Sequence, residues 1–176
     1  MMIERPINEA QPLILPYRVG VGVMLVNRKG LVWTGRRRPK WAASTGSYIW
    51  QMPQGGLNPD EDPEDAAHRE LFEETGIRGA DLIAELPRWL CYDLPPHLLG
   101  VALKGRYRGQ KQRWFAMRYW GDDSDIDLRP YHGRKAEFDR WRWRALSDLP
   151  ADTIDYQRPM YEEIVRVLGP HTQTTR

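Results

Sequence analysis

The first hydrophobic segment of the chain has the pattern of a β-strand. Residues 17–26 (YRVGVGVMLV) are a continuous apolar run rich in β-branched side chains, and a run of this length predicts a buried strand. A polar turn follows at residues 27–30, and residues 31–35 are largely apolar again. We therefore expect two antiparallel strands joined as a hairpin.

Two later segments have the signals of helices. Pro63 suits the first turn of a helix, Asp62 before it suits the N-cap, and Gly76 suits the C-terminal end. Together they predict a helix over residues 63–75. A second helix fits residues 159–168, where apolar side chains recur at helical spacing. These side chains are Met160, Ile164, Val167 and Leu168.

Three further segments, near residues 81–92, 112–119 and 137–144, have strand patterns. Strands mixed with two helices indicate an α/β fold.

The ends of the chain differ from its middle. Residues 1–16 carry three prolines and predict an irregular N-terminal arm. Residues 17–168 would form a single domain, and residues 169–176 would be a frayed tail.

Composition excludes several classes of protein. Hydrophobic residues make up 41% and charged residues 28% of the 176 residues, as in ordinary globular domains. The net charge of +2 gives no strong field, so DNA-specific binding is not expected. No run is long enough for a membrane span, and the N-terminus lacks the apolar core of a signal peptide. Cys91 alone cannot form an intrachain disulfide, so we expect a cytoplasmic protein.

Three glutamates in the first predicted helix are candidate ligands for a metal ion. Glu70, Glu73 and Glu74 stand at positions i, i+3 and i+4, which share one face of a helix. Their like charges repel, and a divalent cation would relieve that repulsion. Carboxylate oxygens suit a hard ion, so we expect Mg²⁺, with Mn²⁺ as the alternative. Taken alone, RELFEE is explained about equally well by a solvated acidic helix.

The segment around these glutamates, residues 55–77 (GGLNPDEDPEDAAHRELFEETGI), resembles the Nudix box. A chance match to its seven fixed charged or glycine positions has a probability of about 10⁻⁸ per starting site. The resemblance implies a Nudix fold, a curved mixed β-sheet sandwiched between α-helices. The fixed positions are Gly55, Glu61, Arg69, Glu70, Glu73, Glu74 and Gly76.

The resemblance also implies metal-dependent hydrolysis of a pyrophosphate linkage. By motif position, Glu70, Glu73 and Glu74 would be catalytic metal ligands. Arg69 would support them in the catalytic site, with Glu61 bracing it. Gly55 would let the backbone approach the metal without a Cβ in the way, although a role as a turn former explains it equally well.

Residues 17–168 as a whole resemble RNA pyrophosphohydrolases and, equally, the related asymmetrical diadenosine tetraphosphate hydrolases. The matching segments are YR at 17–18, WQMPQGG at 50–56, GQKQRWF at 109–115 and EFDRWRW at 137–143.

This wider resemblance assigns residues outside the box. Arg18 and Arg37 would contact phosphates, for which a guanidinium is suited. Glu137 would supply a further metal ligand or base from a distant loop. Tyr156 would stack a base. Gln157 stands where the bacterial RNA enzymes usually carry a lysine, so a phosphate contact is expected to be weaker there.

A basic segment leaves two interpretations open. It is either a solvated face or a surface that steers polyanionic substrates, and in the second case Lys111 would belong to the substrate site. Its cations are Lys104, Arg106, Arg108, Lys111 and Arg113.

We expect an enzyme that removes pyrophosphate from the 5′-triphosphate end of RNA and leaves a 5′-monophosphate. A dinucleoside polyphosphate such as diadenosine tetraphosphate is the alternative substrate, because both molecules offer a base and a polyphosphate. A catalytically silent nucleotide-binding domain is a third reading. The intact glutamates argue against it, since a pure binding module needs no metal cluster.

Overall fold

Two long parallel strands form the centre of the computed structural model, which describes residues 15–37, 48–131 and 133–173. Strand β1 (Tyr17–Val26) pairs with β7 (Gly109–Arg118) along its whole length, from Tyr17 opposite Gly109 to Val26 opposite Arg118. The other strand pairs are antiparallel, so the sheet is mixed. This pairing brings the predicted first strand beside a segment more than eighty residues later in the sequence.

Shorter strands extend this centre on both sides. The main path of the sheet is β3-β2-β1-β7-β5, while β4 pairs with β1, β6 with β7 and β8 with β2. The bounds are β2 Val32–Arg37, β3 Ile49–Gln51, β4 Gln54–Gly56, β5 Asp81–Glu85, β6 Leu90–Asp93 and β8 Arg140–Arg144.

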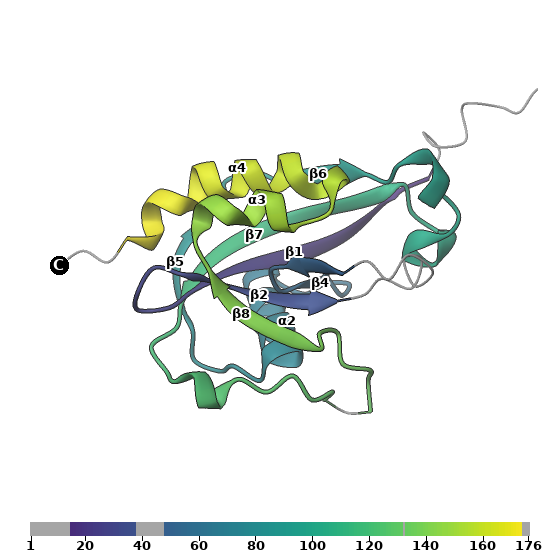
Figure 1. Cartoon of the computed structure of the whole chain (residues 1–176). Helices are drawn as coiled ribbons and strands as arrows, with labels where there is room; N and C mark the ends of the chain where they lie inside the picture. The colour runs from purple at the N-terminus through teal and green to yellow at the C-terminus, as the bar shows by residue number, and fades with distance from the viewer. Residues whose placement is uncertain (1–14, 38–47, 132, 174–176) are drawn as a thin grey trace, which may run out of the picture.

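Helices cover both faces of the sheet. In Figure 1, α3 (Leu149–Asp152) and α4 (Arg158–Leu168) lie on one face and α2 (Pro63–Thr75) on the other. Alternate side chains of β1 point to opposite faces: Val23 packs in the cluster that includes α2, and Met24 in the cluster that includes α4. This is the α/β sandwich expected from the sequence, so the predicted fold class is confirmed.

The ends of α2 follow the predicted signals. The Asp62 side chain accepts hydrogen bonds from the backbone N–H groups of Glu64, at 2.9 Å, and Asp65, at 3.3 Å. Gly76 ends the helix in the left-handed conformation with φ 74°, and its N–H donates to the carbonyl of Phe72. The local sequence therefore sets where this helix begins and ends.

Several boundaries differ from the sequence analysis. The segment 81–92 is two strands, β5 and β6, interrupted around Pro87, which has no N–H for a ladder. The short strands β3 and β4 were not predicted; β3 pairs with β2 and β4 pairs with β1. Residues 1–14 of the expected arm lie outside the described residues.

The expectation of a frayed tail from residue 169 is wrong for its first part. Gly169–Thr172 form the 3-10 helix η7, in which Gly169 and Thr172 are buried. The Thr172 carbonyl accepts a 2.6 Å hydrogen bond from Nη2 of Arg118 on β7. A buried arginine on a central strand needs acceptors, and the tail supplies one.

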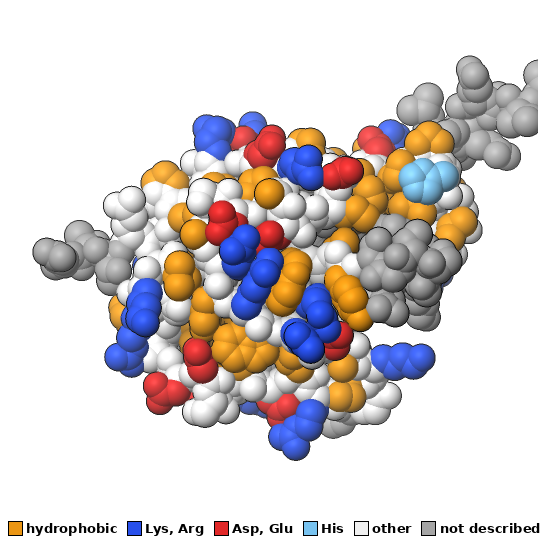
Figure 2. Space-filling model, viewed as in Figure 1, with side chains coloured by type: hydrophobic (Ala, Val, Ile, Leu, Met, Phe, Trp, Pro, Cys, Tyr) orange, Lys and Arg blue, Asp and Glu red, His pale blue; other side chains and the backbone are white. Residues whose placement is uncertain are grey.

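The outer strand β8 carries arginines and tryptophans in alternation, RWRWR. Figure 2 shows Lys and Arg side chains beside hydrophobic ones across the face where β8 lies in Figure 1. The guanidinium of Arg142 lies 3.8 Å from the ring centroid of Trp50, and it also donates to Asp152. None of the helices in the described part of the chain is long and apolar enough to cross a membrane.

Gly22 on β1 tests the packing of the core. A Cβ at this position would overlap the Trp114 ring, which is fully buried. We expect Gly22→Ala to lower the free energy of unfolding by about 1–3 kcal/mol, because an overpacked core must shift its neighbours. Urea denaturation measures this. Gly169→Ala is the matched control: its Cβ would meet nothing closer than 3.6 Å, so its stability should stay near that of the parent.

Candidate functional site

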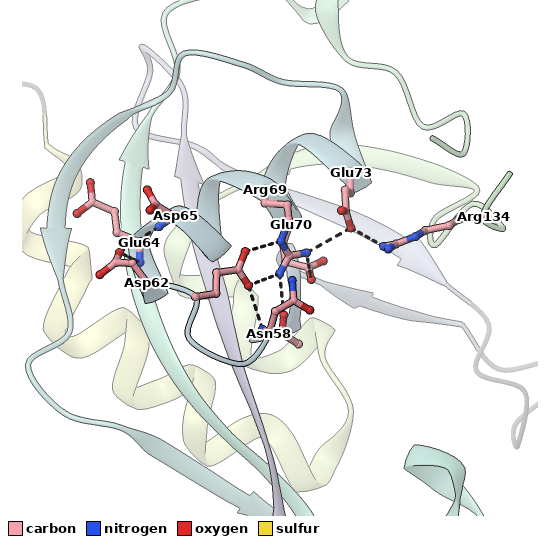
Figure 3. Close-up of polar contacts among 10 residues, drawn as sticks. Asn58, Asp62, Glu64, Asp65, Arg69, Glu70, Glu73 and Arg134 are labelled. Carbon is pink, nitrogen blue, oxygen red and sulfur yellow. Dashed lines mark hydrogen bonds and ion pairs between the residues drawn. The ribbon is translucent and has the colours of Figure 1, made fainter. Parts of the chain in front are cut away.

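Helix α2 turns its glutamates toward the sheet and the loop before β8. Glu70, Glu73 and Glu74 all line one small hollow together with Arg134 and Glu137. Figure 3 shows Glu70 and Glu73 on the same side of the helix, with Arg69 between them and Arg134 approaching Glu73. The Nη1 atom of Arg134 lies 2.7 Å from Oε2 of Glu73. The predicted shared face of the helix is present.

Arg69 is the centre of the charged contacts on α2. Its Nε and Nη2 donate to the two carboxylate oxygens of Glu61 at 2.7 and 2.9 Å, and Nη2 also donates to the Gly56 carbonyl at 2.9 Å. Its Nη1 donates to Glu70 at 2.7 Å. The predicted contact between Arg69 and Glu61 is therefore present. These contacts tie helix α2 to the strand β4 and the loop that follows it.

Gly55 lies directly against the carboxylate of Glu70. A Cβ at Gly55 would overlap the Glu70 carboxyl group, and one at Gly56 would press on the guanidinium of Arg18. Glycine is thus required here by close approach of the backbone to charged groups. The role of Gly55 as a metal ligand stays a prediction.

Glu74 is held against β4 by a backbone contact. The N–H of Gln54 donates to Oε2 of Glu74 at 3.2 Å. Burial, followed by the nearby negative charges of Glu137 and Glu70, raises the pKa of Glu74 well above its usual range. Burial also raises the pKa of Glu70, against the opposing effect of Arg69. The folded chain therefore stores electrostatic repulsion among three carboxyl groups.

These carboxyl groups face a hollow of about 380 Å³, which we call the carboxylate pocket. Glu137 enters it from the loop before β8, and its Oε1 lies 2.7 Å from Nη1 of Arg37. The pocket thus places cations from β1 and β2 opposite carboxylates from α2. Its lining is Arg18, Arg37, Gln54, Gly55, Gly56, Glu70, Glu74, Leu103, Lys104, Gln110, Arg134 and Glu137.

A second hollow of about 390 Å³, the aromatic pocket, adjoins the first. The rings of Tyr92 and Tyr156 lie 5.6 Å apart between centroids at 40°. Gln157 also lines it, but its side chain is only 4% exposed and accepts from Thr153 at 3.4 Å. The full lining is Arg37, Ile49, Gln51, Gln54, Tyr92, Leu94, Val101, Ala102, Leu103, Lys104, Gln110, Tyr156 and Gln157.

Glutamines give the floor of the aromatic pocket a fixed hydrogen-bond direction. Nε1 of Trp114, which can only donate, lies 3.2 Å from Oε1 of Gln112. Gln112 must then donate through Nε2, which lies 2.7 Å from Gln54 and 3.1 Å from Gln110. Nε2 of Gln110 in turn donates a hydrogen bond to the Tyr92 hydroxyl at 2.7 Å. The sequence analysis missed these glutamines, although their alternation along residues 110–114 places them on one face of a strand.

Most of the predicted substrate residues converge here, and one does not. Arg18 and Arg37 line the carboxylate pocket, and Arg37 and Tyr156 line the aromatic pocket. Lys111 points to the opposite face of β7, where its Nζ lies 5.5 Å from the centroid of the Trp89 ring. It lines neither pocket, whereas Lys104 of the same basic segment lines both.

The donors around the carboxylate pocket suit a hard divalent cation. They include the carboxylates of Glu70, Glu74 and Glu137, and the raised pKa values of Glu70 and Glu74 come first from burial and in part from repulsion that a cation would remove. Within the described residues, no three acidic, histidine or cysteine side chains already stand close enough to hold an ion. The Glu70 and Glu137 carboxylates are instead held by Arg69 and Arg37, so side chains would have to move from arginine to metal.

Burial of the Glu70 and Glu74 carboxyl groups, together with this repulsion, predicts a pH dependence of stability. A carboxyl group whose pKa is raised on folding favours the folded state below its ordinary value of 4.5, and this contribution is lost as pH rises through the raised value. We expect the Tm of the metal-free protein to fall as pH rises above 4.5, the ordinary pKa of these carboxyl groups. The fall should be smaller in Glu74→Gln.

Addition of Mg²⁺ should raise Tm more at about pH 8 than at about pH 5.5, because metal binding needs ionised ligands. Differential scanning fluorimetry measures both effects. An equal Mg²⁺ effect in the parent and Glu74→Gln would contradict the role of Glu74.

The chain is similar in sequence and in fold to known proteins. The chain is 52% identical over 157 residues to the RNA pyrophosphohydrolase of Rhizobium meliloti, covering 86% of this chain and 92% of that protein. It is 51% identical over 152 residues to the RNA pyrophosphohydrolase of Rhodopseudomonas palustris, covering 86% and 91%. Among solved structures, E. coli dihydroneopterin triphosphate pyrophosphohydrolase has a TM-score of 0.61 at 21% identity, covering 86% and 98%.

A C. elegans Ap4A hydrolase has the same kind of fold, with a TM-score of 0.56 at 15% identity, covering 86% of this chain and 98% of that structure. The family model described as NUDIX domain matches residues 16–164. Three fixed glutamates of the Nudix box, Glu70, Glu73 and Glu74, lie on α2, and Glu70 and Glu74 line the carboxylate pocket. This chain is a member of the Nudix family.

Proposed function

We propose that this chain removes pyrophosphate from the 5′-triphosphate end of RNA and leaves a 5′-monophosphate. The observation that carries the proposal is the shared wall of the two pockets: Arg37, Gln54 and Lys104 line both. A nucleoside in the aromatic pocket would thus place its phosphates among carboxylates and arginines. The relatives that are about half identical to this chain carry the name of this activity.

Glu70, Glu73, Glu74 and Glu137 would hold a divalent cation, Mg²⁺ or Mn²⁺, together with the backbone of Gly55. When bound, such an ion neutralises charge on the phosphate oxygens during in-line displacement. Arg18 and Arg37 would grip the phosphates, since a guanidinium matches their geometry. Water would cleave the anhydride bond next to the α-phosphate, and a carboxylate facing the pocket would take its proton.

Tyr156 would hold the nucleoside, and Gln54 would position the phosphate that joins it. The Tyr156 ring lies beside Tyr92 at the wall of the aromatic pocket, which suits the flat face of a base. Gln54 lies at the junction of the pockets, with its backbone on Glu74 and its side-chain oxygen fixed by Gln112. Gln157, being buried, would act through packing rather than through a phosphate contact. We propose that the enzyme works in the cytoplasm, as fits its single cysteine.

Parallel kinetics test the substrate. A triphosphorylated RNA of a few nucleotides, a free nucleoside triphosphate and diadenosine tetraphosphate would be compared with Mg²⁺ present. We expect the RNA to have the highest kcat/KM of the three substrates. The ratio of kcat/KM values measures the specificity of the enzyme. Glu74→Gln serves as the inactive control, since it removes one charge at nearly constant volume. Faster turnover of diadenosine tetraphosphate than of the RNA would replace the RNA assignment with the dinucleotide one.

Tyr156 provides a test of nucleoside binding. Stacking on an aromatic ring contributes about 1–3 kcal/mol per base, so Tyr156→Ala should lower kcat/KM by about one to two decades. Tyr156→Phe keeps the ring and should retain most of the activity. An equal loss in both variants would show that the hydroxyl, not the ring, is what the substrate needs.

A further inference from the structure

The outer strand β8 carries three arginines on one face. Arg140, Arg142 and Arg144 stand at alternate positions of this strand, so their side chains point to the same side of the sheet. Arg36 of β2 lies opposite Arg140, and Trp50 of β3 lies opposite Arg36, which continues this side across three strands. Figure 2 shows Lys and Arg side chains beside hydrophobic ones along β8. We call this surface the arginine face; its residues are Arg36, Tyr48, Trp50, Arg140, Arg142 and Arg144.

Aromatic rings stack on two of these guanidinium groups. The guanidinium carbon of Arg142 lies 3.8 Å from the Trp50 ring centroid, and that of Arg36 lies 4.1 Å from the Tyr48 ring centroid. Tyr48 is 42% exposed. Aromatic rings and guanidinium planes are the surfaces on which the unpaired bases of RNA stack. The face thus combines groups for bases with groups for phosphates.

Two of the arginines share one covered carboxylate. Nη2 of Arg142 and Nε of Arg144 lie 2.8 and 2.7 Å from the same oxygen of Asp152, at the end of α3. The Asp152 side chain is only 16% exposed, whereas those of Arg142 and Arg144 are 34% and 32% exposed. The carboxylate is therefore largely shielded while the cations reach solvent. It also orients both guanidinium groups before a ligand arrives.

The other end of β8 has the least compensated charge. Arg140 is exposed and makes no ion pair with any residue in the described part of the chain. Arg36 beside it donates to both carboxylate oxygens of Asp139, at 2.9 and 2.7 Å. The four arginines contact three carboxylates in all, Asp139, Asp148 and Asp152, so the face keeps a net positive charge. This charge is complementary to a polyanion.

Strand β3 connects the arginine face to the aromatic pocket. Ile49 and Gln51 line the pocket, and Trp50 between them points to the other side of the strand, where it meets Arg142. The strand stands at the end of the main path of the sheet. A polynucleotide whose first base lies in the aromatic pocket therefore reaches the arginine face by crossing this one strand.

We propose that the arginine face binds the body of a single-stranded RNA, downstream of the 5′ end held in the two pockets. Guanidinium groups contact the phosphates, and the rings and guanidinium planes stack the bases. Neither kind of contact reads the edges of the bases, so this binding is independent of sequence. The inference rests on the proposed function for the position of the 5′ end.

Binding of two lengths of 5′-monophosphorylated RNA tests the proposal without turnover. One RNA has about three nucleotides and the other, unstructured, has about fifteen, which is enough to cover an extended site. Arg140→Glu should weaken binding of the long RNA about tenfold, the effect of one charged contact. It should leave binding of the short RNA within about twofold. Fluorescence anisotropy of labelled RNA measures both affinities.

The matched control is Lys29→Glu, which makes the same change in net charge in the exposed turn between β1 and β2. Its affinity for the long RNA should stay within about twofold of the parent, because the change lies away from the arginine face. Arg140→Lys, which keeps the charge, should retain most of the affinity. In Arg140→Gln, the slope of log Kd against log salt should fall by about 0.7, as expected for one lost phosphate contact on a single strand.

Three results would overturn the proposal: equal losses of Arg140→Glu on both lengths, an equal loss in Lys29→Glu, or a parent that binds the long RNA no more tightly than the short one. A parent that binds RNA in this way but does not hydrolyse triphosphorylated RNA would reject the proposed function instead. The length dependence would then still decide whether the arginine face binds RNA.

Discussion

The crowding of negative charge on α2 is the constraint around which this site is built. Glu70 and Glu74 are packed against β4, and Glu74 is close enough to Glu70 and Glu137 for their charges to repel. Arg69 offsets this negative charge, since its guanidinium contacts Glu61, Glu70 and the Gly56 carbonyl at once. One guanidinium thereby joins the helix, the glycine pair and the loop between them. Removal of that cation would leave buried carboxylates without compensation, which is costly in a protein interior.

Glycines on the strands permit close packing around this site. Gly20, Gly22 and Gly55 all lie where a Cβ would overlap a neighbour: the Gly55 carbonyl, the Trp114 ring and the Glu70 carboxylate, respectively. Gly55 lets α2 approach the sheet closely, whereas Gly22 makes room for the Trp114 ring on the opposite face of the sheet. A close approach brings the carboxylates to the edge of the sheet, where Arg18 and Arg37 face them.

The parallel pairing of β1 with β7 places the carboxylate pocket next to the aromatic pocket. It sets Arg18 opposite Gln110, so the cation proposed to bind phosphate and the glutamine floor of the aromatic pocket are neighbours across two strands. The hydrogen-bond direction from Trp114 through Gln112 to Tyr92 fixes these amides before any ligand arrives. A preorganised site of this kind spends little free energy on ordering itself when substrate binds.

The sequence by itself determined the elements whose signals are local. The apolar run of β1, the Asp62 cap and Gly76 at the end of α2, and the spacing of Glu70, Glu73 and Glu74 depend on residues a few positions apart. Only the tertiary structure decided which distant segments meet these elements. It turned Lys111 away from the site because alternate residues of a strand face opposite sides. It brought Gln54, Gln110 and Lys104 to the pockets because the β1–β7 pairing and the left-handed turn at Leu103 join segments that no local pattern connects.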